Sequence, residues 1–259
     1  MRVVFEELWK SRALVAALVR RHIATRYRGS FLGFLWSFLN PLCLMAVYTL
    51  VFSHYMRVSG GPHYHLMVFS GLLPWIWTTS ALTEGTSSLV SSGHLITKSL
   101  FPAHVLPFVT VASSMIHFLL ALPVLWVFMM LGGVPITASW LLLPLIVFLH
   151  GIFLVGCVLG LSALNVFYRD VQHLLGNFLT LIFFLCPVVY PRSNIPERVR
   201  FWFELNPFAL LTEMYQMILL EGVVPSVAQL AYLAVLSATF LVIGIAIHQF
   251  HREQFAEAL

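Results

Sequence analysis

The sequence predicts an all-α integral membrane protein with six transmembrane helices, an N-terminal amphipathic helix at the membrane interface and a re-entrant helical hairpin before the last span. Three observations predict this class. Hydrophobic residues make up 60% of the 259 residues and charged residues only 9%, whereas soluble domains contain about 45–50% and 25%. Six stretches are long and apolar enough to cross about 30 Å of hydrocarbon. A further apolar stretch near the outer surface carries acidic residues that a simple span would not tolerate.

The N-terminal segment 6–28 precedes every span, and it reads as a helix that lies in the plane of the interface. Its apolar residues fall on one broad arc of the predicted helix, whereas its basic residues fall mostly on the other side, as in interfacial helices. The apolar set is Leu8, Trp9, Leu14, Val15, Leu18, Val19 and Ile23, and the basic set is Lys10, Arg20, Arg21 and Arg28.

The six spans belong to a single transmembrane domain that covers residues 1–259. The fourth is the clearest, because its Leu, Ile, Val and Phe each contribute about −0.3 to −0.6 kcal/mol near the helix centre and outweigh Pro144 and His150. No small-residue cleavage site is found near the first apolar run, so we expect the first span to act as the insertion signal. We place the spans near 31–53, 66–90, 105–131, 140–165, 172–190 and 225–248.

The stretch 201–220 has the length of a span but is interrupted by polar residues. Each acidic residue at the centre of a span would cost roughly 2.5–3.5 kcal/mol, and two of them cancel most of the apolar gain. We therefore predict two short helices, about 196–205 and 208–221, that dip back toward the outer surface and form an outer gate. The candidate gate residues are Arg198, Arg200, Trp202, Glu204, Asn206 and Glu213.

The distribution of basic residues predicts the orientation. The first 30 residues hold seven Lys or Arg, and Lys98, Arg169 and Arg252 fall on the same side of a six-span chain, which gives ten. The opposite side has four. Because the positively charged side of a membrane protein stays in the cytoplasm, both termini are expected there.

Three inner-side segments have a functional and an ordinary interpretation. The loop 91–104 is either a short helix that docks on a cytosolic partner or a plain connector. Arg26 and Arg28 either hold lipid phosphates or anchor the topology. Arg169 either pairs with Asp170 or anchors the inner boundary of span four, or it lies in an ordinary solvated turn.

Ionisable residues within the spans raise the alternative of a membrane-embedded transferase that uses His150 or Glu84 as a base. His117 and His150 have no carboxylate near them in their own spans, which favours a structural role, and Glu84 is expected to pair with a basic residue at the interface. No metal site or disulfide is expected from Cys43, Cys157 and Cys186. The chain contains no G-x-x-x-x-G-K-[ST] sequence, so it lacks a P-loop for ATP.

Four ordered blocks resemble the permeases of ABC type-2 transporters, and more narrowly those that export capsular polysaccharide, O-antigen and teichoic acid. The blocks begin at Arg26, Ser70, Leu161 and Leu185, and the resemblance covers about residues 5–257. The sequences are RYRGSFLGFLWSFLNPLCLMAVYTLVF, SGLLPWIWTTSALTEGTSSLVSSGHLITKSLFP, LSALNVFYRDVQHLL and LCPVVYPRSNIPERVRFWFELNPFALLTEMYQMILLEG.

The resemblance implies a non-enzymatic permease subunit in a bacterial inner membrane that forms a homodimer. It implies a pair of separate cytosolic ATPase subunits that hold ATP and Mg²⁺, so that no cofactor binds to this chain. It also implies a lipid-linked glycan as substrate and periplasmic export proteins as further partners. An exporter of small molecules or drugs shares the same fold and remains an alternative.

The resemblance also implies roles for two sets of residues. The coupling helix that contacts the ATPase maps to about 91–101, with His94, Leu95, Ile96, Lys98, Leu100 and Phe101 as contact candidates. The channel between two copies is lined chiefly by the first and fifth spans. Its aromatic candidates are Phe31, Phe34, Trp36 and Phe38 at one end, and Phe183, Phe184 and Tyr190 at the other.

Overall fold

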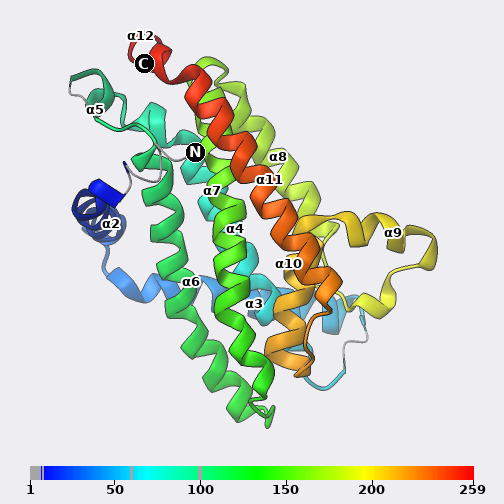
Figure 1. Cartoon of the computed structure of the whole chain (residues 1–259). Helices are drawn as coiled ribbons and strands as arrows, with labels where there is room; N and C mark the ends of the chain where they lie inside the picture. Colours follow the sequence, from blue (N-terminus) through cyan, green and yellow to red (C-terminus); the bar gives the residue numbers. More distant parts are fainter. Residues whose placement is uncertain (1–6, 8, 59–60, 99–100) are drawn as a thin grey trace.

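The computed structural model describes residues 7, 9–58, 61–98 and 101–259, and over these residues the chain is helical without a β-strand. Long helices pack side by side in an elongated bundle, with shorter helices at its ends (Figure 1). The predicted all-α fold class is therefore confirmed. Five helical segments among the described residues are long and apolar enough to cross a membrane: Gly33–Tyr55, Tyr64–Ser91, Val105–Leu131, Ala138–Phe167 and Val227–Ala258.

Helix α4 (Tyr64–Ser91) is the centre of the bundle and packs against α6 (Val105–Leu131) and α7 (Leu143–Phe167). Of its most apolar stretch, 78% is buried inside the protein, compared with 28% for α6. Lipid gives helices no hydrophobic reason to associate, so such burial depends on close van der Waals packing and hydrogen bonds between helices. Helix α4 thus forms the framework on which the other helices are positioned.

Helices α7 and α11 (Val227–His251) approach each other most closely at two glycines. A Cβ atom at Gly244 would lie 2.0 Å from the carbonyl oxygen of Gly156, and a Cβ at Gly156 would lie 2.4 Å from the backbone nitrogen of Leu241. Small residues at a crossing point let two membrane helices bring their backbones together. This contact holds the last span against the bundle.

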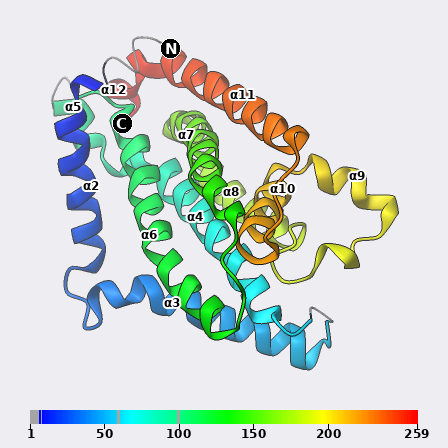
Figure 2. The same ribbon diagram turned by 60° about the horizontal axis from the view of Figure 1, so that its bottom comes forward.

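The first span is the least covered by the rest of the chain, because only 11% of it is buried. It consists of η1 (Gly33–Leu35), α3 (Trp36–Tyr48) and the π-helical η2 (Thr49–Tyr55). Figures 1 and 2 show α3 running across the bundle at a steep angle to α4 and α6. Much of this span is therefore free to contact lipid or another protein.

Helix α8 (Asp170–Phe184) is shorter than the predicted fifth span, 172–190. Its 15 residues extend about 22 Å, less than the hydrocarbon thickness of about 30 Å. The chain leaves the helix after Phe184 and turns toward η4 (Arg192–Asn194). Pro187 lies just beyond the helix end and has no backbone N–H with which to continue it.

Two short helices follow, as the outer-hairpin prediction requires. Helix α9 (Glu197–Leu205) is exposed and projects to the side of the bundle (Figure 1), whereas α10 (Pro207–Gln216) packs against α4 and continues into η5 (Met217–Glu221). The depth of the two helices in a bilayer stays a prediction.

Several short elements gather at the opposite end of the bundle, which is called the inner end here because it is predicted to face the cytoplasm. Helix α2 (Arg12–Tyr27) packs against α6. Glu7, Trp9 and Lys10 before it are also helical, so the described part of the predicted interfacial segment 6–28 is helical over nearly its whole length. Helix α5 (Gly93–Lys98) contacts α12 (Phe255–Ala258), which follows α11 through η6 (Arg252–Gln254). Figures 1 and 2 both show α5 and α12 together. One more short helix, η3 (Ala138–Leu142), leads into α7.

Candidate functional site

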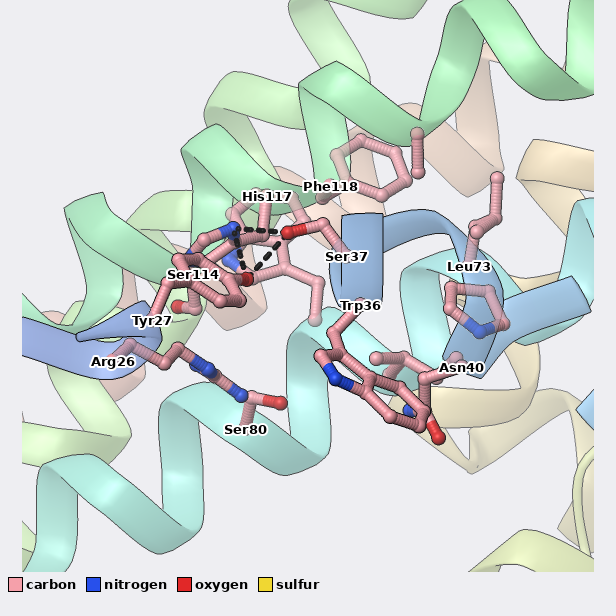
Figure 3. A pocket seen from close by; sticks show the side chains of 14 residues that line it. Arg26, Tyr27, Trp36, Ser37, Asn40, Leu73, Ser80, Ser114, His117 and Phe118 are labelled. Atoms are coloured by element: carbon pink, nitrogen blue, oxygen red, sulfur yellow. Dashed lines mark hydrogen bonds between the residues drawn. The ribbon is translucent and has the colours of Figure 1, made fainter. Parts of the chain in front are cut away.

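A polar cavity lies where α2, α3, α4 and α6 meet, and it has a volume of about 250 Å³. Figure 3 shows side chains from all four helices converging on it. One wall is apolar and includes Leu73 and Phe118. The polar groups that line it are Arg26, Tyr27, Ser37, Asn40, Ser80, Ser114 and His117, with the indole of Trp36 beside them. Polar residues in the interior of a membrane-spanning bundle are costly, and they often mark a functional path.

A three-membered hydrogen-bonded cluster closes one side of the cavity. The hydroxyl groups of Tyr27 and Ser37 hydrogen-bond each other, and each oxygen lies 3.3 Å from Nδ1 of His117 (Figure 3). The ring of Phe34 packs edge-on against Tyr27, with a centroid distance of 5.6 Å. This cluster joins the end of α2, the beginning of α3 and the middle of α6, and so fixes the position of the first span.

An ion pair neutralises the charge beside the cavity. The guanidinium Nη1 of Arg26 lies 2.9 Å from Oε1 of Glu84, and Nε2 of His22 lies 3.4 Å from Oε2 of the same carboxylate. The expectation that Glu84 pairs with a basic residue is confirmed. Of the three predicted phosphate-binding residues, only Arg26 lines the cavity. Arg28 and Arg169 are exposed at the C-cap of α2 and the N-cap of α8.

The second intramembrane histidine lies in a closed core. His150 is fully buried, its Nε2 lies 3.0 Å from the hydroxyl of Thr78, and its Nδ1 lies 3.3 Å from the hydroxyl of Tyr215. The ring of Trp77 covers it at a centroid distance of 4.3 Å. Since no carboxylate among the described residues contacts His150 and no substrate can reach it, the geometry favours a structural role over a general base.

In the segment between α8 and α9, Arg192 contacts two of the acidic residues of the hairpin, Glu204 and Glu213. Its Nη2 lies 2.9 Å from Oε1 of Glu204, and its Nη1 forms an ion pair with Glu213. The Glu213 side chain is only 9% exposed, whereas that of Glu204 is 50% exposed. Sequence reasoning identified both acids but missed Arg192, which makes the burial of Glu213 tolerable.

Other hydrogen bonds fix the two ends of α10. The side-chain oxygen of Asn206 accepts a hydrogen bond from the backbone N–H of Phe208 at 3.1 Å, which caps α10. The amide of Gln216 donates to the carbonyl oxygens of Met67 at 3.2 Å and Pro187 at 2.8 Å. The remaining predicted gate residues are exposed on α9: Arg198, Arg200 and Trp202.

The predicted coupling segment lies on α5 at the inner end. His94 is exposed, whereas Leu95, Ile96 and Phe101 pack into an apolar cluster with the buried ring of Phe255 from α12. Leu100 and the side chain of Lys98 lie outside the described part of the chain.

A polar group adjoins this cluster at the beginning of α6. His104 is buried, with its Nδ1 3.5 Å from Glu7, and Glu7 lies 3.6 Å from Arg252. The ring of His248 is 6.4 Å away. Burial lowers the pKa of His104, against the opposing effect of Glu7.

The predicted channel aromatics have different environments. Phe31 is fully exposed, Phe34 and Trp36 are partly exposed, and Phe38 contacts Phe34 at 5.4 Å. Within this single chain Phe183 is buried against Trp75 at a centroid distance of 5.6 Å. Phe184 is exposed, and the hydroxyl of Tyr190 donates to its carbonyl oxygen at 2.9 Å. A channel wall built from these residues stays a prediction.

Lipid does not require a polar cavity in a helical bundle, whereas a protein that moves polar material across the bilayer does. The helical fold and the polar cavity agree with the class of membrane transport proteins. The chain belongs to the ABC-2 type transporter family, whose model matches residues 13–220.

Relatives cover almost the whole chain. It is 40% identical to the O-antigen export system permease protein RfbA of Myxococcus xanthus, over 98% of both chains. It is 31% identical to the protein of the same name from Klebsiella pneumoniae, over 95% of both. It is 22% identical to the polysialic acid transport protein KpsM of Escherichia coli, over 92% of this chain and 93% of that one.

Proposed function

We propose that this chain is the membrane-spanning subunit of an ATP-driven exporter that moves lipid-linked polysaccharide across a bacterial inner membrane. The observation that carries this proposal is the 40% identity, over 98% of both chains, to a permease named for O-antigen export. The polar cavity supports it, because a glycan cannot cross hydrocarbon without polar groups to replace its water.

The energy for export comes from a separate subunit in this proposal. The 259 residues contain no P-loop sequence, so ATP and Mg²⁺ would bind to two copies of a cytosolic ATPase. Helix α5 is the proposed contact with that ATPase. The side of α5 that faces the bundle packs on α12, so a displacement of α5 by the ATPase would be transmitted to the last span.

A second copy of this chain would complete the channel. The first span is only 11% buried, and such an uncovered helix suits an interface between two permease subunits. Both termini would lie in the cytoplasm. Arg28 and Arg169 would meet lipid phosphates at the inner surface, while Arg26 stays paired with Glu84. The hairpin of α9 and α10 would gate the outer exit. Periplasmic proteins would receive the polysaccharide there.

Two alternatives make different predictions. An exporter of a small molecule shares the fold, but deletion of such an exporter would leave the amount of surface glycan unchanged. A transferase that uses His150 or Glu84 would turn over substrate without an ATPase. The closed environment of His150 and the ion pairs of Glu84 disfavour the transferase.

The test is purification of the tagged chain from its native membrane, followed by identification of what accompanies it. The proposal expects an ABC ATPase in equal amount and a lipid-linked glycan, and it expects deletion of the chain to leave that glycan inside the cell. Normal surface glycan in the deletion strain would refute the polysaccharide substrate. Turnover by the isolated chain without an ATPase would refute the exporter.

A further inference from the structure

We propose that the polar cavity binds one uncharged sugar ring of the exported glycan, with Asn40, Ser80 and Trp36 as the groups that contact it. This inference rests on the proposed polysaccharide substrate. It assigns to the cavity a sugar and not the phosphate of the lipid carrier.

The charge balance favours an uncharged ligand. Arg26 is the cation that lines the cavity among the described residues, and its guanidinium is 2.9 Å from the carboxylate of Glu84. A phosphate at this place would have to compete with Glu84 for Arg26 and would meet the negative charge of that carboxylate. A sugar hydroxyl does not have to displace Glu84 from Arg26 and is not repelled by the carboxylate, because it exchanges hydrogen bonds with neutral groups.

Two side chains have hydrogen-bonding groups to offer. The hydroxyls of Ser37 and Ser114 are already bonded, to Tyr27 and to backbone carbonyl oxygens of α6. Asn40 and Ser80 line the cavity without a side-chain hydrogen bond to any residue that the structure describes. An amide and a hydroxyl together supply both donors and acceptors, which is what a ring bearing several hydroxyl groups requires.

An aromatic surface lies next to these groups. The indole of Trp36 is 48% exposed, and Figure 3 places it beside Asn40, away from the Tyr27–Ser37–His117 cluster. A sugar ring has an apolar C–H face as well as polar edges, so an exposed indole can cover the face while Asn40 and Ser80 bind the edges. Apolar and aromatic walls with a few placed polar groups are the usual composition of small-molecule sites.

The size of the cavity agrees with this ligand. Sites for drug-sized ligands have volumes of about 300–1,000 Å³, so a cavity of about 250 Å³ holds a smaller group, of the order of one ring.

The first experiment measures export by the double variant Asn40→Ala/Ser80→Ala in cells that make the glycan and lack their own copy of the chain. We expect surface glycan to fall roughly tenfold, the effect of two lost neutral hydrogen bonds, at unchanged permease level. ATP hydrolysis by the purified permease–ATPase complex should persist, which shows that the complex is folded. The matched control is Cys43→Ala, an exposed α3 residue one turn from Asn40 that does not line the cavity.

The second experiment places a benzophenone-bearing phenylalanine analogue at position 80 or at position 43, and irradiates the cells. We expect glycan attached to the permease, detected by periodate oxidation, at position 80 and not at position 43. Attachment of a labelled lipid phosphate without sugar at position 80 would overturn the inference, as would wild-type export by the double variant. If cells with the wild-type chain display no more glycan than cells without it, the proposed function itself fails.

Discussion

Removing the guanidinium of Arg192 should destabilise the outer hairpin, because it leaves the carboxylate of Glu213 buried without a partner. Arg192→Gln keeps a polar side chain but removes the positive charge that both Glu213 and Glu204 contact. Glu213 belongs to α10, which packs against the central helix α4, so its unpaired charge would disturb the core of the bundle.

The magnitude follows from the exposure of the two partners. Breaking a buried ion pair costs about 3–5 kcal/mol. The lower end applies here, since the Glu213 side chain is 9% exposed but that of Arg192 is 41% exposed. We expect a loss of about 3 kcal/mol in the free energy of unfolding, or about 6–12 °C in Tm for a chain of this size.

The assay is thermal unfolding of the purified protein in lipid nanodiscs, and two further variants serve as controls. Glu204→Gln breaks the exposed pair with the same arginine and should cost less than about 1 kcal/mol. Arg192→Gln/Glu213→Gln removes both charges and should recover most of the stability. If Arg192→Gln and Glu204→Gln lower Tm equally, or if the double variant is no better than Arg192→Gln, the buried pair does not have the role assigned to it.

Three more predictions concern the inner end and the helix crossing. Gly244→Leu should prevent stable packing of α11, because its Cβ would lie 2.0 Å from a carbonyl oxygen of α7. The measurement is the yield of monodisperse protein. The control Gly176→Ala should be neutral, because no atom lies within 4 Å of the added Cβ. Phe255→Ala should lower the free energy of unfolding by about 3–5 kcal/mol, because the ring is 1% exposed, whereas Phe250→Ala, at a ring 79% exposed, should leave Tm unchanged. Burial lowers the pKa of His104, so the unfolded chain binds a proton at this histidine more readily, and the stability should fall as the pH drops below about 6.5. His104→Gln should flatten the dependence of Tm on pH between 7.5 and 5.5. An unchanged slope in this variant would contradict the role assigned to His104.

The sequence predicted the helical class and two short helices in the stretch 196–221, because both follow from local properties; the place of these helices at the outer surface stays a prediction. Apolar length identifies a span, and the acids of the stretch 201–220 reveal that it is not a simple one. The same reasoning cannot find Arg192, since the charge that compensates Glu213 lies 21 residues away and reaches it only through the turn after α8. Local patterns therefore show that a buried charge is costly, but not which residue neutralises it.

The cavity was beyond sequence reasoning for the same reason. Its polar residues come from four helices, and no spacing along the chain brings Asn40 next to Ser80. Arg26 and Trp36 were selected as candidates from the inner basic cluster and the aromatic run, yet with different roles and without a common site. The steep crossing of α3, which brings its first turns to the middle of α4 and α6, is a tertiary feature that the apolar length of 31–53 does not contain.

Several polar residues within the apolar segments have partners in the chain, which indicates a structural role for them. Glu84, Glu213, His150 and Gln216 all lie within apolar segments, and each contacts a partner within the chain. The free-energy cost of burying these polar groups is offset in every state that keeps those helices together. Asn40 and Ser80 differ, because they face an open cavity and bond to no described side chain or backbone group. An amide and a hydroxyl that face a cavity can exchange hydrogen bonds with water or with a ligand that enters it, which is the role proposed for Asn40 and Ser80.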